Sequence, residues 1–307
     1  FLPFPSEPSA ADTQFMPAPA PALTFRSIGH AAAFACGLEA AAPKVGNVHR
    51  GADFSDLTLY DFLLSGQLLG ETLELQATRP LGELILAAIS ATRQQVQTNS
   101  NLGIVLLFAP LTKCFREGAL STCTVLDVLE ASTARDAQLI YEAIRLAQPG
   151  GLGNSAQHDV RSPTTPSHIL EAMQLARDHD LIARQYCTGF ADIFDLGVPT
   201  LVSETVRLNS LVRAIVSTHL CLIGTLGDSL VRRKCGRELE QQLQVRCQRI
   251  VDRIMTAGWE AGEAELADLD FWLRSDGNRR NPGATADLIA ASLFVGLLSG
   301  QLQWRVP

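Results

Sequence analysis

The chain has 307 residues, of which 47% are apolar and 19% charged, and its formal net charge is -7 with a pI near 5.4. An apolar fraction of this size supports a sizeable core and excludes a wholly disordered chain. The acidic balance argues against a broad nucleic-acid-binding face, but it is compatible with a local basic pocket for a small polyanion.

Residues 1–27 are rich in proline and alanine, and six of the fifteen prolines lie within the first 24 positions. This segment lacks the basic start and the continuous apolar stretch of a signal peptide. We therefore expect a disordered Pro/Ala-rich arm over 1–27, followed by one domain over 28–307.

The spacing of the cysteines and the length of the apolar runs indicate where in the cell the protein is expected. The seven cysteines are scattered and form no CxxC pair, which favours reduced core cysteines in a cytoplasmic protein. The longest apolar runs, 104–111 and 288–298, are well short of the ~20 residues that span a bilayer, so no membrane partner is expected.

From about residue 30 onward the pattern is helical. Apolar residues recur every three or four positions, and the alternation of a strand is hard to find. Pro80 suits the first turn of a helix, and Ser132 and Asp136 mark another helix start. The clearest expected helices cover 58–76, 81–97, 132–148, 165–178, 202–223, 237–257, 264–274 and 285–302. With about eleven helices and no confident strand, the predicted fold class is all-α, a compact single-domain multi-helix bundle.

The first polar segment, 39–56, separates two apolar helical stretches and mixes charges of both signs. Gly46 and Gly51 would let its backbone approach a ligand closely. Phosphate binding would use Lys44 and Arg50, and Mg²⁺ would use carboxylate oxygens. A solvated loop is the simpler alternative, but the mixture of charges and glycines favours a functional site.

Two further polar segments interrupt the helices before residue 160. Asn99 and Asn101 precede the apolar run at 104–111, and they could either cap that helix or hold a ribose or a base edge. The glycine-rich segment 149–159 lacks the GK[ST] ending of a phosphate-binding loop, which favours a lid or a plain helix end.

The last two polar segments precede C-terminal helices. Residues 232–234 are three consecutive bases that follow Asp228, as expected for a solvated helix end or for a triphosphate site. Pro282 and Gly283 place free N–H groups at a helix start, which is a ready anion site. Asp287 either stabilises that helix or holds Mg²⁺, since it would repel a bare phosphate.

Five motifs in these segments match one family pattern. They are 42–50 (APKVGNVHR), 53–58 (DFSDLT), 98–103 (TNSNLG), 228–234 (DSLVRRK) and 281–288 (NPGATADL). Together they resemble the triphosphoribosyl-dephospho-CoA synthase family (ATP:dephospho-CoA triphosphoribosyltransferases) over roughly residues 30–302. The resemblance implies an all-helical transferase that joins the 2′-hydroxyl of 3′-dephospho-CoA to C1 of the ATP ribose and releases adenine. The product is the prosthetic-group precursor for the acyl-carrier subunit of citrate or malonate lyase-type enzymes.

The resemblance also implies roles for individual residues around an oxocarbenium-like transition state. The base that activates the hydroxyl would be Asp53 or Glu39. The residues expected to bind nucleotide or phosphate are Lys44, Gly46, Asn47, Arg50, Asn99, Asn101, Arg233, Lys234 and Gly283. The carboxylates expected to hold Mg²⁺ on the triphosphate are Asp56, Asp228 and Asp287. The expected partners are ATP and a CoA-like acceptor, with no nucleic acid.

The chain departs from the family pattern at two motifs. Val45 stands where a PKPG sequence has proline, and Leu102 stands where a T-N-T-x-K-G motif has lysine. The chain thus resembles a divergent NVxR/NLG branch, and the acceptor is open. One alternative is a related nucleotide or phosphoribosyl transferase of another cofactor pathway, for example one-carbon pterin cofactor synthesis. Another is a helical nucleotide-binding protein without activity, against which the retained carboxylates argue.

Overall fold

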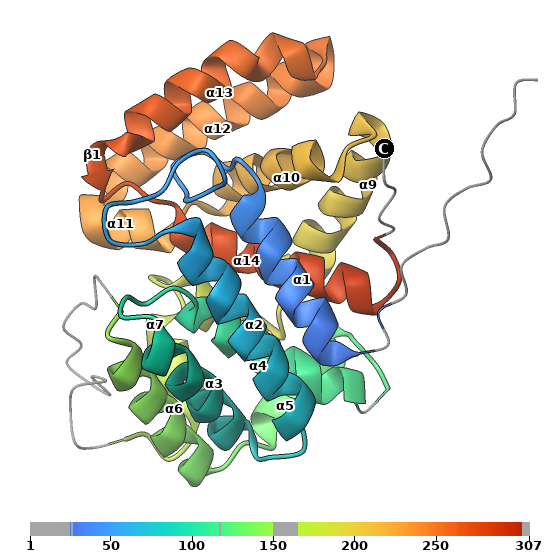
Figure 1. Cartoon of the computed structure of the whole chain (residues 1–307), viewed down its shortest axis with the longest axis vertical. Coiled ribbons are helices and arrows are strands. Elements are labelled where there is room, and N and C mark those ends of the chain that lie inside the picture. The colour runs from blue at the N-terminus through green and yellow to red at the C-terminus, as the bar shows by residue number, and fades with distance from the viewer. Residues whose placement is uncertain (1–24, 26, 117, 150–164, 303–307) are drawn as a thin grey trace, which may run out of the picture.

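The structure, a computed structural model, describes residues 25, 27–116, 118–149 and 165–302. These residues form fourteen α-helices, one π-helix (η1) and one short extended segment (β1), arranged as Figure 1 shows. The bounds are α1 Ile28–Ala41, α2 Leu59–Gln76, α3 Leu81–Gln95, α4 Leu102–Arg116, α5 Thr122–Glu130, α6 Ala134–Ala147, α7 Ile169–Ala176, α8 Leu181–Thr188, η1 Asp192–Gly197, α9 Val198–Leu208, α10 Leu211–Leu226, α11 Ser229–Cys235, α12 Arg237–Ala257, α13 Trp259–Arg274, β1 Ser275–Asn278 and α14 Gly283–Leu298. The predicted all-α class is confirmed. The predictions for the arm 1–27 and for the segment 149–159 lie almost wholly outside the described residues.

Side-chain caps fix several helix starts. Thr58 accepts from the backbone N–H of Asp61, whose carboxylate accepts in return from the Thr58 N–H at 2.8 Å. Thr133 and Asp136 form the same reciprocal pair at the start of α6. Such capping boxes satisfy backbone donors that the first helical turn leaves free. They place these two starts within one or two residues of the sequence prediction.

Three expected helix boundaries are wrong. The apolar stretch 202–223 is two helices, because Asn209 adopts a left-handed conformation with φ 45° and ends α9. The Ser210 side chain then caps α10. The helix expected from 264 begins earlier, at Trp259, after a glycine that offers no side-chain cap. The helix expected from 165 begins at Ile169.

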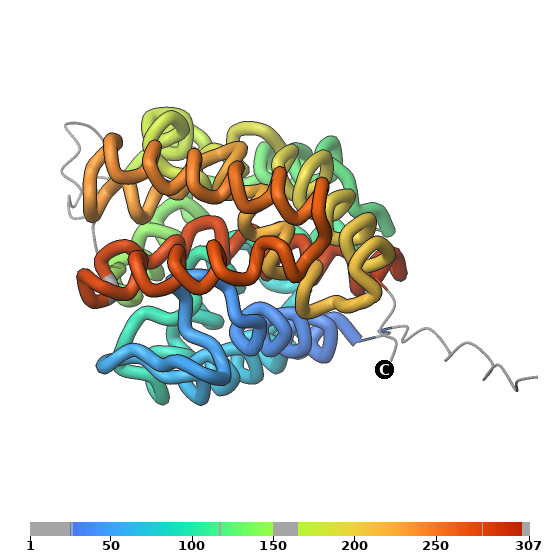
Figure 2. Tube along the Cα trace, turned by 90° about the horizontal axis from the view of Figure 1, so that it is seen from above, coloured from blue at the N-terminus to red at the C-terminus, as the bar shows by residue number. Residues whose placement is uncertain are grey.

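The largest hydrophobic cluster surrounds α14, which runs through the middle of the molecule in Figure 1. Helices α1 and α2 cross at glycines, and a Cβ atom on Gly29 would lie 2.5 Å from the Gly70 carbonyl oxygen. A second cluster joins α10 to α13, and α10 contributes to both clusters. Figure 2 shows α12 and α13 lying side by side, and Figure 1 places them at the top end of the molecule.

The described helices were also compared with the length and hydropathy of a membrane span. No single one of them is long and apolar enough to cross a bilayer. Helices α10 and α11 reach that length and composition only when taken together across a 61° bend.

Candidate active site

Three of the polar segments meet at the N-terminal end of α14. Asn47 Nδ2, from the loop between α1 and α2, donates to Asn281 Oδ1 at 2.8 Å. From the other side, Asp228 Oδ2 accepts from both the N–H and the hydroxyl of Thr285 at 2.8 Å. Figure 1 shows the loop between α1 and α2 passing beside α11 and the start of α14. Segments separated by more than two hundred residues are therefore in direct contact.

The segment 98–103 completes the assembly. A Cβ atom on Gly103 would lie 2.0 Å from Asp287 Oδ2, so the carboxylate rests directly against the first turn of α4. The Thr98 hydroxyl donates to the Asp56 carbonyl oxygen at 3.1 Å. We call residues 39–58, 98–103, 228–234 and 281–287 the motif cluster.

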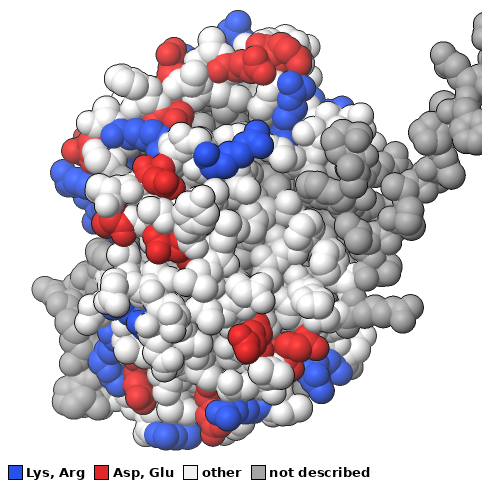
Figure 3. Space-filling view, viewed as in Figure 1, with Lys and Arg blue, Asp and Glu red and all other residues white. Residues whose placement is uncertain are grey.

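Two buried charges of the motif cluster form an ion pair. Lys44 Nζ lies 2.9 Å from Glu39 Oε1 and also donates to the Glu39 carbonyl oxygen. Lys44 is 0% exposed and Glu39 is 4% exposed. In Figure 3 the middle of the face, where α1 and α2 run in Figure 1, carries few charged side chains. The Lys44 ammonium group is therefore enclosed by the protein and contacts Glu39 rather than an open surface.

Asp287 lies next to this pair and is the most perturbed carboxylate of the cluster. Burial raises its pKa well above the ordinary value, and the charges of Glu39, Asp228 and Asp180 raise it further. It is half-buried, and within the part of the chain that the structure describes it has no hydrogen-bond partner. A carboxylate crowded by like charges favours a proton or a cation.

Asp228 is placed differently from its predicted role as a metal ligand. Its Oδ1 accepts from the N–H groups of Leu230 and Val231 at 2.9 and 3.0 Å, and its Oδ2 is held by Thr285. Burial raises its pKa, against the opposing effect of these bonds. Because four donors occupy both oxygens, the residue caps α11 and ties it to α14 in this structure, and its role as a metal ligand stays a prediction.

The two asparagines before α4 also act within the protein. Asn99 Oδ1 accepts from the Leu102 N–H at 3.2 Å, and buried Asn101 Nδ2 donates to Thr92 Oγ1 at 3.1 Å. The capping alternative therefore describes Asn99. Leu102, which stands where a T-N-T-x-K-G motif has lysine, is buried in the hydrophobic cluster. The side chain at this position therefore belongs to the core.

The remaining predicted residues lie toward the surface of the motif cluster. Asp53 is exposed, and its Oδ1 accepts from the Leu59 N–H at 2.7 Å, at the start of α2. Arg50 is exposed, whereas Lys234 is half-buried and its pKa is lowered mainly by burial. Arg233 forms an ion pair with Asp180.

A clamp from α13 was not visible in the sequence. Asp270 Oδ1 accepts from the Gly46 N–H at 2.7 Å, and Arg274 binds Asp270 through Nε at 2.9 Å. Arg274 also donates to the carbonyl oxygen of Asn47. Gly46 has φ 71°, a conformation that favours glycine. The acid and the base are four positions apart, a spacing that on sequence alone indicates only an ordinary surface pair.

We expect Asp270→Ala to lower turnover by roughly 10–100-fold, because the loop that presents Asn47 loses its anchor. Exposed Asp268, on the same helix, provides a control, and Asp268→Ala should match the wild type. Steady-state kinetics with both variants checks this. Equal activity of the two variants would show that the clamp does not position the loop.

A buried histidine of α10 also contacts the motif cluster. His219 Nε2 lies 3.1 Å from the Thr285 hydroxyl, and His219 is 0% exposed. Burial, followed by the nearby charge of Lys44, lowers its pKa to about 3. The imidazole is therefore neutral at physiological pH and supports Thr285 rather than donating a catalytic proton.

The contact between Gly103 and Asp287 gives a direct test of the assembly. Gly103→Ala should displace the carboxylate and reduce both activity and thermal stability. The matched control is Gly37→Ala in α1, where an added Cβ would lie 3.6 Å from its nearest neighbour, the Leu63 side chain. The control should be neutral or should stabilise the protein by up to about 1 kcal/mol. Thermal melts and turnover measurements of both variants test this expectation. A Gly103→Ala variant with unchanged activity and thermal stability would contradict the placement of Asp287.

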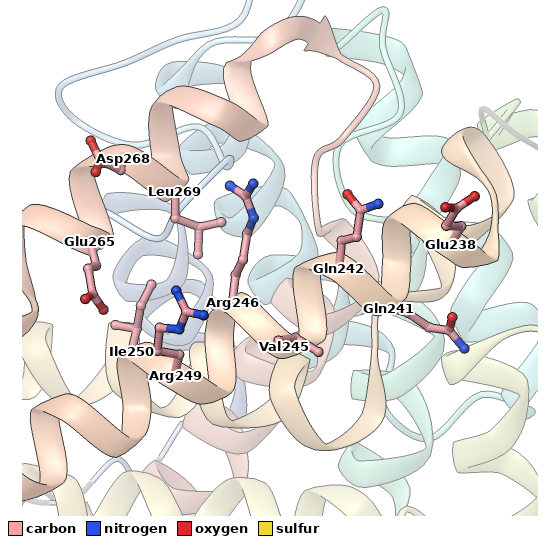
Figure 4. Close-up of a pocket in the computed structure, with 10 residues that line it drawn as sticks. All are labelled: Glu238, Gln241, Gln242, Val245, Arg246, Arg249, Ile250, Glu265, Asp268 and Leu269. Atoms are coloured by element: carbon pink, nitrogen blue, oxygen red, sulfur yellow. The ribbon is translucent and has the colours of Figure 1, made fainter.

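A larger hollow than any described above lies outside the motif cluster. It measures about 710 Å³ and runs between α12 and α13, with Arg246 and Arg249 among its lining residues (Figure 4). None of the predicted site residues lines it. Among the described residues, no group of three or more His, Cys, Asp or Glu side chains is arranged to hold a metal ion.

Comparison with known proteins identifies the family of the chain. The family model described as CitG, ATP:dephospho-CoA triphosphoribosyl transferase, matches residues 25–306. A crystal structure of a provisionally assigned triphosphoribosyl-dephospho-CoA synthase from Archaeoglobus fulgidus is 25% identical, with a TM-score of 0.59. The match covers 79% of this chain and 98% of that one. No curated protein matches. The chain thus belongs to the ATP:dephospho-CoA triphosphoribosyl transferase family, whose substrates are ATP and dephospho-CoA.

Proposed function

We propose that this protein is a triphosphoribosyl-dephospho-CoA synthase whose active site is the motif cluster. The observation that carries the proposal is the convergence of four distant segments on Asp287 and the buried Glu39–Lys44 pair. Family membership supplies the substrates and the reaction class.

The reaction exchanges one bond at the anomeric carbon of the ATP ribose. The C1–N9 bond breaks and its electron pair leaves with adenine, while the acceptor 2′-oxygen forms the new C1–O bond. The hydroxyl proton passes to a base, and N9 of adenine takes up a proton. We assign the base to Glu39, because Asp53 is exposed and holds the first turn of α2. Lys44 then orients Glu39 and offsets its charge, while Arg50 and Lys234 neutralise phosphate oxygens.

Magnesium fits this cluster at Asp287 and does not fit at Asp228. The Asp287 carboxylate lacks a hydrogen-bond partner among the described residues and is crowded by other carboxylates, whereas both oxygens of Asp228 are occupied. Mg²⁺ is usually held by one or two carboxylates together with substrate phosphates. We propose that Asp287 and Asp56 hold the ion, which supplies charge neutralisation on the triphosphate when bound.

The test is incubation of the purified chain with ATP, Mg²⁺ and dephospho-CoA, followed by chromatography for adenine and mass spectrometry of the product. We expect adenine release that depends on dephospho-CoA, and a product heavier by one triphosphoribosyl group. Adenine release only with another acceptor would favour a related transferase, to which the Leu102 departure points. Binding of ATP without adenine release would indicate a non-catalytic nucleotide-binding protein.

A further inference from the structure

A second pocket, of about 410 Å³, lies beside the motif cluster. It is lined from the α7–α8 turn and from α8, α10, α11 and α12, and it includes three arginines, Arg177, Arg184 and Arg232. Leu181 and Leu226 provide apolar wall. Three guanidinium groups around one hollow suit a phosphate-bearing ligand.

The pocket adjoins the motif cluster directly, because Ser229 and Arg232 of the motif cluster line it. Asp180, which also lines the pocket, pairs with Arg233 of the motif cluster and is close enough to raise the pKa of Asp287. The Leu181 N–H donates to Ser229 Oγ at 3.1 Å, next to Asp228. A ligand in the pocket would therefore lie against the motif cluster.

The three arginines differ in whether other residues already form ion pairs or hydrogen bonds with them. Arg184 is held by Asp192, with Nε 3.0 Å from Oδ2. Arg232 Nε is 3.8 Å from Glu240, a long ion pair. Arg177 is exposed and has no ion pair or hydrogen bond among the described residues. Arg177 is thus the cation of this pocket that is available to a ligand.

Carboxylates also line the pocket. Asp178 is exposed, Asp180 is engaged by Arg233, and Glu240 is 7% exposed and lies near Arg232. A ligand made only of phosphate groups would offer these carboxylates no hydrogen-bond donor. A ligand that combines a phosphodiester with hydroxyl and amide donors would be accommodated, because carboxylate oxygens accept from those donors.

The acceptor of the proposed reaction has this combination of groups. In dephospho-CoA the reacting 2′-hydroxyl and the 5′-diphosphate sit on the same ribose, and the pantetheine arm beyond the diphosphate carries a hydroxyl and two amides. With the hydroxyl at Glu39, the diphosphate must lie about one sugar ring away, beside the motif cluster rather than within it. We propose that the Arg177 pocket binds the diphosphate and the adjoining arm of the acceptor, an inference that rests on the proposed function.

Arg177→Ala and Arg177→Glu test the assignment in the full chain, with Arg249→Ala as the matched control. Arg249 is an exposed arginine of the α12–α13 hollow. We expect the KM for dephospho-CoA to rise about tenfold in Arg177→Ala and further in Arg177→Glu, as for the loss of one charged hydrogen bond. The KM for ATP should stay unchanged, and the control should match the wild type. An unchanged KM for dephospho-CoA, or a rise in the KM for ATP instead, would overturn the assignment.

Calorimetric titration with dephospho-CoA separates this inference from the proposed function. If the wild-type chain binds dephospho-CoA without releasing adenine, the proposed function fails, and a weaker Kd in Arg177→Glu would still support the pocket. If the Kd is the same in Arg177→Glu and the wild type, the pocket assignment fails whatever the activity.

Discussion

Replacing Asp287 by asparagine should reduce adenine release by roughly 10²–10³-fold or more, the scale of losing one charge-stabilising group, while raising the melting temperature. In the proposed site the carboxylate would supply the charge that a metal–triphosphate needs, and an amide of the same shape would not. The gain in stability follows from removing a charge that burial and neighbouring acids disfavour. Activity and stability therefore move in opposite directions, as expected for an active-site residue.

The gain in melting temperature of the Asp287→Asn variant depends on pH in a definite direction. Because the folded chain raises the pKa of Asp287, it holds the proton more tightly than the unfolded chain does. The favourable contribution of the protonated group is fully present below its unfolded pKa and is lost as the pH rises through the folded value. Thermal melts should therefore show the Asp287→Asn gain as largest at pH 8 and shrinking as the pH is lowered. An asparagine variant that melts below the wild type at pH 8 would contradict the placement of this carboxylate.

Lys44→Met should destabilise the protein strongly. Removing one partner of a buried ion pair leaves an uncompensated charge, which typically costs about 3–5 kcal/mol. Lys44 and Glu39 are both buried and lie 2.9 Å apart. Denaturant unfolding measures the loss, and the variant should also be inactive.

The double variant Glu39→Gln/Lys44→Met separates stability from function. With both charges gone, most of the lost stability should return, because neutral side chains of similar size fill the same space. Activity should not return, since the proposed base is absent. A double variant that releases adenine would remove Glu39 and Lys44 from the mechanism, and a fully stable Lys44→Met would show that the pair is not buried in solution.

Where local signals were strong, the helices could be predicted from the sequence. The range 237–257 coincides with α12, and Thr58 caps α2 as its position before an apolar pattern indicates. The division at Asn209 was missed because the apolar pattern continues on both sides of it. Hydrophobic spacing reports which face is buried, and a single left-handed residue leaves that spacing almost unchanged.

The sequence predicted which segments carry the site, but it did not predict the contacts between them. Each motif was identified from its polar residues, yet only the tertiary structure shows that Asn47 meets Asn281 and that Asp287 meets Gly103. Burial was equally invisible: the sequence marked Lys44 as a phosphate-binding residue, and the structure shows that it is buried and paired with Glu39. The single-domain organisation stays a prediction, as do the roles of the individual site residues.

The central claim is that the four segments of the motif cluster form one pocket for a metal–triphosphate. A crystal structure with Mg²⁺ and a non-hydrolysable ATP analogue tests it most directly. We expect the triphosphate and its ion at Asp287, enclosed by residues 39–58, 98–103, 228–234 and 281–287. A nucleotide bound instead in the hollow between α12 and α13, with Asp287 unoccupied, would contradict it.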